Sequence, residues 1–430
     1  MNIIKSLSNR ISVKSAVFFF ITFLITSTIA FGQVEICNNG LDDDFDGFID
    51  CYDGSCANSS LCDGSFLGND ANCSVPPPQF PLFTMTLDFA SPNETTNHLA
   101  RMAIGDLDRD GTPEIVTMNR YTKKLFILNG NDGSIKSQTT VAWEPQWEIA
   151  IGNIDNDNCA EIFFIGQDNT PAGTTNDGIY LFAYDCNLNL LWKTAKKLPS
   201  DPINFGLADF DNDGLIELYA KDEIYDAKTG TRIVKSSAAS YTKINGGPVA
   251  ADIIDDPGPA DDNKLELILG LTIFKVNLGG RTVDAGSLTL LKNRAEYFIR
   301  DVYNATSIAD FNQDGFLDVV ASGSTIGFDK NTTIFYWDVK NDVLKTYRDL
   351  TSSYGANGWA NGTGRVNIAD LDGDGKLNVS YVSGQYLYAL KEDLTLHWRI
   401  NINEETSGYT GCTLFDFNGD GKSEIVYRDE

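Results

Sequence analysis

Seven short acidic loops recur along this chain, and their side chains have the types and spacing of ligands for a hard cation. In the clearest copy, residues 106–114, acids stand at positions 1, 3, 5 and 9 and a glycine stands at position 6. Calcium takes six to eight oxygen ligands in a flexible cage, and glycine adopts the turn conformation that a β-carbon disfavours. The first three acids can therefore point inward, position 7 can offer its carbonyl, and the acid at position 9 can close the cage. We expect calcium in these loops, with about six to eight ions in the whole chain.

The loops are numbered here in chain order. They are loop 1 at residues 106–114, loop 2 at 153–161, loop 3 at 209–217, loop 4 at 252–266, loop 5 at 310–318, loop 6 at 370–378 and loop 7 at 416–424. Positions 1, 3, 5, 7 and 9 of the six regular loops are the predicted ligands: Asp106, Asp108, Asp110, Thr112, Glu114; Asn153, Asp155, Asp157, Cys159, Glu161; Asp209, Asp211, Asp213, Leu215, Glu217; Asp310, Asn312, Asp314, Phe316, Asp318; Asp370, Asp372, Asp374, Lys376, Asn378; and Asp416, Asn418, Asp420, Lys422, Glu424. An insert stretches loop 4; its expected ligands are Asp252, Asp255 and Glu266, and the sequence leaves open whether it binds metal.

The alternative for each loop is a plain Asp-Gly hairpin turn, which needs no metal. A hairpin turn, however, does not require an acid three residues after its glycine. Loop 2 departs most from the pattern, with Asn153 at position 1 and Asn158 in place of glycine. Asparagine tolerates the left-handed conformation better than most residues, so we expect a weakened site there. Asp106→Ala or Asp209→Ala should therefore cost more stability than Asn153→Ala.

Short apolar runs flank each loop and predict the elements that position it. One run enters the loop, a second leaves it, and two further runs follow before the next loop. Short β-rich runs at regular spacing indicate an all-β array, and fixed-period repeats indicate propellers or solenoids. We predict a seven-bladed β-propeller at 79–430 with the metal loops between the first and second strands of each blade. The apolar residue at position 2 of the loops is expected to face the core: Leu107, Phe210, Phe311, Leu371 and Phe417.

The repeats resemble the FG-GAP/VCBS repeats of integrin-α-like β-propellers. Besides the acidic loops, Phe205-Gly206 before loop 3 and the Gly-Gly-Pro at 246–248 before loop 4 fit that pattern. The resemblance covers about residues 80–430 and rests on repeated loops, not on one motif. It implies calcium between the first and second strands of each blade, and ligand binding, where there is any, on the opposite face.

Residues 1–32 have the pattern of a secretory signal. Lys5, Arg10 and Lys14 precede an apolar stretch at 16–31. This stretch is too short and contains too many serines and threonines to indicate a membrane span. We predict a secreted or cell-surface protein with no membrane insertion after cleavage; an uncleaved anchor is the alternative.

Residues 33–78 form a small cysteine-rich segment with an EF-hand-like acidic loop. It resembles a short Asp-rich metal-binding motif of secreted bacterial proteins, and so small a segment should need disulfides and metal to fold. A zinc site is disfavoured because the cysteines lack a paired CxxC spacing and no histidine is near. The predicted calcium ligands are Asp42, Asp44, Asp46, Phe48, Asp50 and Asp53. A stiff Pro-Pro-Pro linker at 76–78 ends the segment.

Charge and composition narrow the function. The formal net charge of −27 makes nucleic acid and anionic membranes poor partners, and bound divalent ions would offset the self-repulsion. Enzyme signals are weak: the two histidines, His98 and His397, have no nucleophile beside them. The leading hypothesis is a binding or adhesion module for a protein or glycan. The alternatives are a calcium-dependent polysaccharide lyase or hydrolase, which would need a base beside its substrate, and a structural spacer.

Aromatic residues on the connections that precede the first strands are the ligand-binding candidates. On the face opposite the metal loops they could form a platform for sugars or an anchor for a protein, and packing between blades is the alternative. They are Trp143, Trp147, Tyr241, Tyr303, Trp359 and Tyr409.

Two further expectations concern the cysteines and the last blade. Cys159 and Cys186 both lie in the second blade and can pair in a secreted protein; two buried thiols are the alternative. Cys412 is expected to be a buried core residue. Only residues 425–430 follow loop 7, so we expect an incomplete last blade, repaired at most in part by residues 80–89, and a natural chain that continues further.

Overall fold

The computed structural model describes residues 89–92, 95, 102–155, 157–167, 178–195, 198, 204–235, 247–254, 264–294, 306–324, 332–348, 365–383, 386–402 and 412–427. The chain divides into two units at Thr86 and Leu87, and all of these residues belong to the second unit. The signal, the cysteine-rich segment with its ligands at 42–53, and His98 lie outside the described residues. No helix among the described residues is long and apolar enough to cross a membrane.

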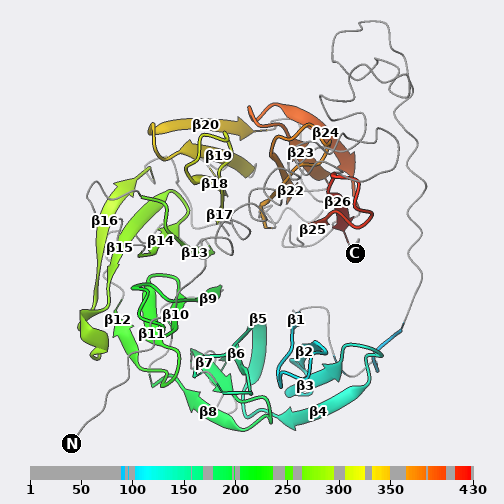
Figure 1. Cartoon of the computed structure of the whole chain (residues 1–430), viewed down its shortest axis with the longest axis vertical. Helices are drawn as coiled ribbons and strands as arrows, with labels where there is room; N and C mark the ends of the chain where they lie inside the picture. Colours follow the sequence, from blue (N-terminus) through cyan, green and yellow to red (C-terminus); the bar gives the residue numbers. More distant parts are fainter. Residues whose placement is uncertain are drawn as a thin grey trace, which may run out of the picture. The chain divides into compact units, whose positions relative to one another are not determined.

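The described residues form antiparallel sheets, numbered here in chain order (Figure 1). Sheet 1 contains β1 (Met102–Gly105), β2 (Glu114–Asn119), β3 (Lys124–Asn129) and β4 (Ile135–Thr140). Sheet 2 contains β5 (Glu144–Gly152), β6 (Glu161–Gln167), β7 (Ile179–Tyr184) and β8 (Leu190–Lys193). Sheet 3 contains β9 (Phe205–Ala208), β10 (Glu217–Ala220), β11 (Glu223–Asp226) and β12 (Arg232–Val234).

Sheet 4 contains β13 (Pro248–Ala251), β14 (Glu266–Leu269), β15 (Thr272–Asn277) and β16 (Ser287–Asn293), with the short 3-10 helix η3 (Gly279–Arg281) between β15 and β16. Sheet 5 contains β17 (Thr306–Ala309), β18 (Asp318–Ser324), β19 (Thr332–Asp338) and β20 (Val343–Arg348). Sheet 6 contains β21 (Asn367–Ala369), β22 (Asn378–Ser383), β23 (Tyr386–Leu390) and β24 (Leu396–Asn401), and sheet 7 contains β25 (Cys412–Phe415) and β26 (Glu424–Tyr427).

Strand pairing follows one pattern throughout the described sheets. Six sheets have four strands paired in chain order, and sheet 7 has two. The first strands contact one another in succession, β1 with β5, β5 with β9, and onward to β25 (Figure 1). The predicted all-β class is confirmed for the described residues, and this arrangement is consistent with a propeller-like β fold.

Each acidic loop joins the first strand of a sheet to the second. The residue before position 1 pairs directly with the residue at position 9, as in Gly105 with Glu114 and Ala208 with Glu217. The same register holds in the other sheets, including Ala251 with Glu266 across the stretched loop 4. The acid at position 9 is therefore the first residue of the second strand, and the sheet fixes where its side chain begins.

The core lies between neighbouring sheets, because each sheet is covered by the next. Leu107 and Val116 of sheet 1 pack in one buried cluster with Ile162 and Phe164 of sheet 2. At position 2 of the loops, Leu107, Phe210 and Phe311 are buried, as predicted. Burial of these residues anchors the start of their loops against the core.

Phe417 of loop 7 does not follow that prediction. Its side chain is 44% exposed, and its ring contacts that of the exposed Phe415 at 5.1 Å. The described part of sheet 7 has two strands, and the buried cluster at this end is small, with Val382, Leu387 and Cys412 at its centre. Cys412 itself is a buried free thiol. Residues 80–88 lie outside the described part of the chain, so the predicted repair of the last blade stays a prediction.

Candidate metal centres

One hydrogen bond recurs in all seven acidic loops. The backbone N–H of position 2 donates to a side-chain oxygen of position 9, for example from Leu107 to Glu114 Oε2 at 2.9 Å and from Phe210 to Glu217 Oε2 at 2.9 Å. Loop 4 keeps the bond across its insert, from Ile253 N to Glu266 Oε2 at 3.1 Å. The corresponding bonds of the other loops are 2.8–3.1 Å long. This bond fixes the side chain of position 9 in every loop, and in all loops but loop 6, which ends in Asn378, that side chain has a second carboxylate oxygen.

The acids at positions 1 and 5 hold the turn itself. Asp209 accepts the N–H groups of Asp213 at 3.1 Å and Gly214 at 2.8 Å, and Asp213 accepts that of Leu215 at 2.8 Å. In loops 1, 5, 6 and 7 the acid at position 1 likewise accepts the N–H of the glycine at position 6. These bonds explain part of the acidic pattern without a metal.

Backbone conformation accounts for the glycine at position 6. Gly111, Gly214 and Gly315 have φ between 82° and 87°, the left-handed region that only glycine enters without strain. Position 4 is left-handed as well, with φ of 57° at Arg109 and 58° at Asn212. The sequence analysis did not predict a left-handed conformation at position 4, although the glycines at position 4 of loops 6 and 7 indicate it.

Carboxylates of five loops approach one another closely enough to share an ion. One ligand oxygen from each member lies within 4.8 Å of the others in Asp106–Asp108–Glu114, Asp155–Asp157–Glu161, Asp209–Asp211–Glu217, Asp370–Asp372–Asp374 and Asp416–Asp420–Glu424. These are the predicted ligands of loops 1, 2, 3, 6 and 7. Several acidic clusters of this protein can therefore bind metal ions.

Burial makes four of the loop acids costly to ionise. Desolvation raises the pKa of Glu217 to about 7, although the Phe210 N–H and Arg281 oppose the shift. Burial and then the nearby Asp338 raise the pKa of Asp318 to about 6. Burial also raises the pKa of Asp211 and Glu161, with neighbouring acids adding to it. A bound cation would offset this repulsion.

Unpartnered oxygens test whether a hard cation fits. Buried polar atoms are nearly always hydrogen-bonded, yet Oδ1 of Asp211, Asp318 and Asp372 is buried without a hydrogen-bond partner. Each belongs to position 3 or 9 of a loop. An all-oxygen donor set with orphaned carboxylate atoms fits calcium better than a soft metal.

Replacing Asp318 with asparagine should have opposite effects on the stability of the protein in chelator and in calcium. Asn378 already occupies position 9 of loop 6 and accepts the Leu371 N–H at 2.8 Å, so asparagine can keep the lock. In chelator the raised pKa makes wild-type stability fall as the pH rises from about 4 to about 6, because ionisation is unfavourable in the fold. Asp318→Asn should remove that fall and stabilise the chelated protein at pH 7 by on the order of 2 kcal/mol.

With calcium bound, Asp318→Asn should instead destabilise the protein, because the variant lacks a carboxylate ligand. Thermal denaturation of both proteins at pH 4 and 7, with chelator and with calcium, checks this. A variant that is destabilised equally in chelator and in calcium would contradict it.

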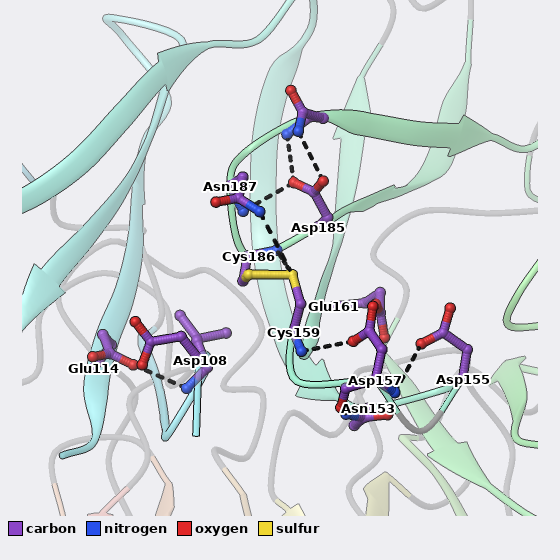
Figure 2. Close-up of a disulfide and its surroundings, with 12 residues drawn as sticks. Asp108, Glu114, Asn153, Asp155, Asp157, Cys159, Glu161, Asp185, Cys186 and Asn187 are labelled. Atoms are coloured by element: carbon purple, nitrogen blue, oxygen red, sulfur yellow. Dashed lines mark hydrogen bonds between the residues drawn. A yellow bond between two sulfur atoms is a disulfide. The ribbon is translucent and has the colours of Figure 1, made fainter. Parts of the chain in front are cut away.

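Loop 2 is the exception in its geometry. Asn153 donates from Nδ2 to the Asp157 carbonyl at 2.6 Å. Asn158 is not among the described residues with positive φ, so it does not take the glycine conformation that the sequence suggested. Cys159 at position 7 is joined to Cys186 by a disulfide, as predicted, with Cα atoms 5.3 Å apart. Figure 2 shows this link tying the end of loop 2 to the turn between β7 and β8.

Side-chain cations of the protein itself reach some of the loops. In loop 1, Lys136 Nζ lies 2.7 Å from Glu114 Oε1 and 2.9 Å from Asp108 Oδ2. In loop 3, Arg281 Nη1 donates to Glu217 Oε1, and Nη2 donates to Asp226 Oδ2 at 2.8 Å. His397 Nε2 lies 3.7 Å from Asp372 Oδ2 of loop 6, which places it beside a metal-ligand candidate.

Neighbouring loops are bonded to each other. The backbone N–H of Ala160 in loop 2 donates to the Leu107 carbonyl of loop 1 at 2.8 Å, and Ser423 of loop 7 donates to the Asp370 carbonyl of loop 6 at 2.8 Å. Leu265 of loop 4 donates to the Phe210 carbonyl of loop 3 at 3.0 Å. Bonded loops of adjoining sheets lie on the same side of those sheets.

Of the aromatic candidates, Trp143 alone has a described side chain. It is half-buried against the cluster between sheets 1 and 2, its ring centroid 4.7 Å from that of Phe182. Lys193 Nζ lies 4.7 Å from the Trp143 ring centroid. For Trp143 this favours packing between sheets over a free platform. The side chain of Trp147, and the whole of Tyr241, Tyr303, Trp359, Tyr409 and Asp255, lie outside what the structure describes.

Comparisons with known proteins returned solved structures of low sequence identity. No protein-family model matches the chain, and no curated protein matches it either. The V. cholerae biofilm matrix protein Bap1 is similar over 79% of this chain and 79% of its own, with 14% identity and a TM-score of 0.49. BamB from Moraxella catarrhalis is similar over 73% of this chain and 77% of its own, with 14% identity and a TM-score of 0.40.

The exotype rhamnogalacturonan lyase YesX is similar over 68% of this chain and 50% of its own, with 16% identity and a TM-score of 0.27. Because all three TM-scores are below 0.5, these similarities do not indicate the function of this protein.

Proposed function

We propose that this protein is a secreted, calcium-stabilised β-propeller with seven blades of the FG-GAP/VCBS kind, which binds a protein or glycan ligand as an adhesion or recognition module. The observation that carries the proposal is the bond from position 2 to position 9 in every loop. A lock repeated sheet after sheet, beside orphaned carboxylate oxygens, supports a metal-braced scaffold. The two histidines and the acids at loop spacing do not form a catalytic group by sequence, which supports a binding role over an enzymatic one.

Calcium in this proposal acts on structure. It would be held by the carboxylates of positions 1, 3, 5 and 9 and by the carbonyl of position 7, and it would supply positive charge to a loop that repels itself. The ligand surface is assigned to the face opposite the loops, where the connections before the first strands lie. A rigid scaffold of sheets would hold these connections in fixed positions, and binding residues commonly lie on loops that are held in this way.

A binding screen tests the proposal. The secreted protein is presented to glycan and extracellular-protein arrays in calcium and in chelator, and we expect a specific ligand that is bound in calcium alone. The same glycans are incubated with the protein and assayed for chain cleavage. Cleavage of a polysaccharide would replace the proposal with the lyase or hydrolase alternative, and no binding to any probe would favour the structural spacer.

A further inference from the structure

The second oxygen of position 9 distinguishes the loops from one another. In every loop one side-chain oxygen of position 9 accepts the N–H of position 2, and in all loops but loop 6, which ends in Asn378, a second carboxylate oxygen remains. In loop 1 it meets Lys136, in loop 3 it meets Arg281, and in loop 5 the corresponding Asp318 Oδ1 is buried with no hydrogen-bond partner. Loops 1, 3 and 5 therefore differ in the partner of the second carboxylate oxygen at position 9, although their sequences are similar.

Lys136 contacts the oxygens that a metal in loop 1 would need. Its Nζ lies 2.7 Å from Glu114, 2.9 Å from Asp108 and 4.0 Å from Asp110, which are positions 9, 3 and 5. An ammonium has three donors and no acceptor, so it can satisfy several carboxylates at once. Calcium and the ammonium would compete for the same oxygens and repel each other.

Arg281 reaches position 9 of loop 3 from the next sheet, although Oδ1 of Asp211 at position 3 of that loop has no hydrogen-bond partner. It belongs to η3 of sheet 4, and the segment that carries it is fastened to β12 of sheet 3 by Asp284 N to Arg232 O and Gly286 N to Ile233 O, both at 3.0 Å. Its guanidinium donates to the fully buried Glu217 and lies 3.9 Å from Asp213. Backbone hydrogen bonds just after this arginine hold its segment to sheet 3, so its place at loop 3 is part of the contact between the two sheets.

Two further lysines, Lys340 and Lys228, make weaker contacts with loops 5 and 2. Lys340 Nζ lies 3.8 Å from Asp314 of loop 5 and is 42% exposed, and Lys228 Nζ lies 3.7 Å from Asp155 of loop 2 and is 62% exposed. Each reaches a single acid at position 3 or 5 and leaves position 9 alone. Exposed single contacts of this length are worth little and would not exclude a divalent ion.

We propose that loops 1 and 3 are closed by cations of the protein itself, Lys136 and Arg281, and that calcium loads loops without such a cation, among them loop 5, where the buried Asp318 Oδ1 has no hydrogen-bond partner. The inference rests on the proposed calcium-stabilised scaffold and revises its stoichiometry. Lys136 and Arg281 are thus specificity-determining residues for metal occupancy. They keep two loops closed at any calcium concentration, while the remaining loops respond to it.

Calcium stoichiometry tests the inference. The full secreted chain is stripped of calcium, dialysed to saturation, and its bound calcium per chain is measured by atomic emission, with circular dichroism to verify folding. Asp108→Asn in loop 1 should leave the bound calcium unchanged, and Asp314→Asn in loop 5 should lower it by about one ion. Lys136→Met and Arg281→Met should each raise it by about one ion, and the matched control Lys340→Met should not change it.

Each outcome decides a different claim. Loss of an ion in Asp108→Asn, with no gain in Lys136→Met, overturns the internal-cation inference and leaves the calcium scaffold standing. A wild-type chain that binds no calcium overturns the scaffold and the inference together. Because Asp108→Asn keeps the lysine, it remains informative even where Lys136→Met or Arg281→Met does not fold.

Discussion

Chelation of calcium should lower the melting temperature of the protein by about 15 °C. An ion present at 100 times its dissociation constant stabilises the fold by about 2.7 kcal/mol, so about four loaded loops together contribute about 11 kcal/mol. For a domain of this length, 1 kcal/mol corresponds to roughly 1.4 °C from the average unfolding entropy per residue. Added calcium should restore the transition, and magnesium, which demands a tighter octahedral cage, should restore less of it.

Differential scanning calorimetry in chelator, calcium and magnesium measures this effect. Asp314→Asn is the variant that should shrink it, and Asp132→Asn, in the β3–β4 turn outside the acidic loops, is the control that should not. A melting curve that is the same in excess chelator and in calcium would refute the metal-braced scaffold. The acids of the loops would then be explained by their turn hydrogen bonds alone.

Removing the disulfide between Cys159 and Cys186 should destabilise the protein by about 3–4 kcal/mol. The bridge closes a segment with a sequence separation of 27, and the loss of chain entropy in the unfolded state accounts for a stabilisation of that size. Loop 2 has a particular need for the bridge, since it lacks the glycine turn and the aspartate at position 1 of the other loops. The double variant Cys159→Ser/Cys186→Ser should therefore also bind calcium in loop 2 more weakly.

Denaturant titration of the oxidised wild type and the double variant gives the free-energy difference. Cys412→Ser is a control for the loss of a thiol outside the bridge. A mild reductant should move the wild-type transition of the β-sheet domain to that of the double variant and leave the double variant where it is. Equal stability of the oxidised wild type and the double variant would show that the bridge does not stabilise the fold.

Regular spacing explains why much of this protein could be predicted from its sequence. A nine-residue loop must return the chain to an antiparallel partner, so the pairing of Gly105 with Glu114 repeats wherever the spacing repeats. The conformation of Gly111 follows from the same local geometry, with φ at 87°. Cys159 and Cys186 could be paired because they occupy adjoining turns of one sheet. All of these features depend on contacts within one repeat.

Features that depend on contacts between repeats were decided by the tertiary structure. The sequence treats position 2 of every loop alike, yet Phe311 is buried and Phe417 is exposed. Phe311 packs in a buried cluster with Val379 and Tyr381 of sheet 6, whereas the described cluster at sheet 7 is small. Arg281 is 64 residues from Glu217 along the chain and reaches it only because sheet 4 lies against sheet 3. By itself the sequence determines where acids can gather. Which oxygens a protein cation already neutralises is decided by packing, since charge acts through space and at short range in a buried site.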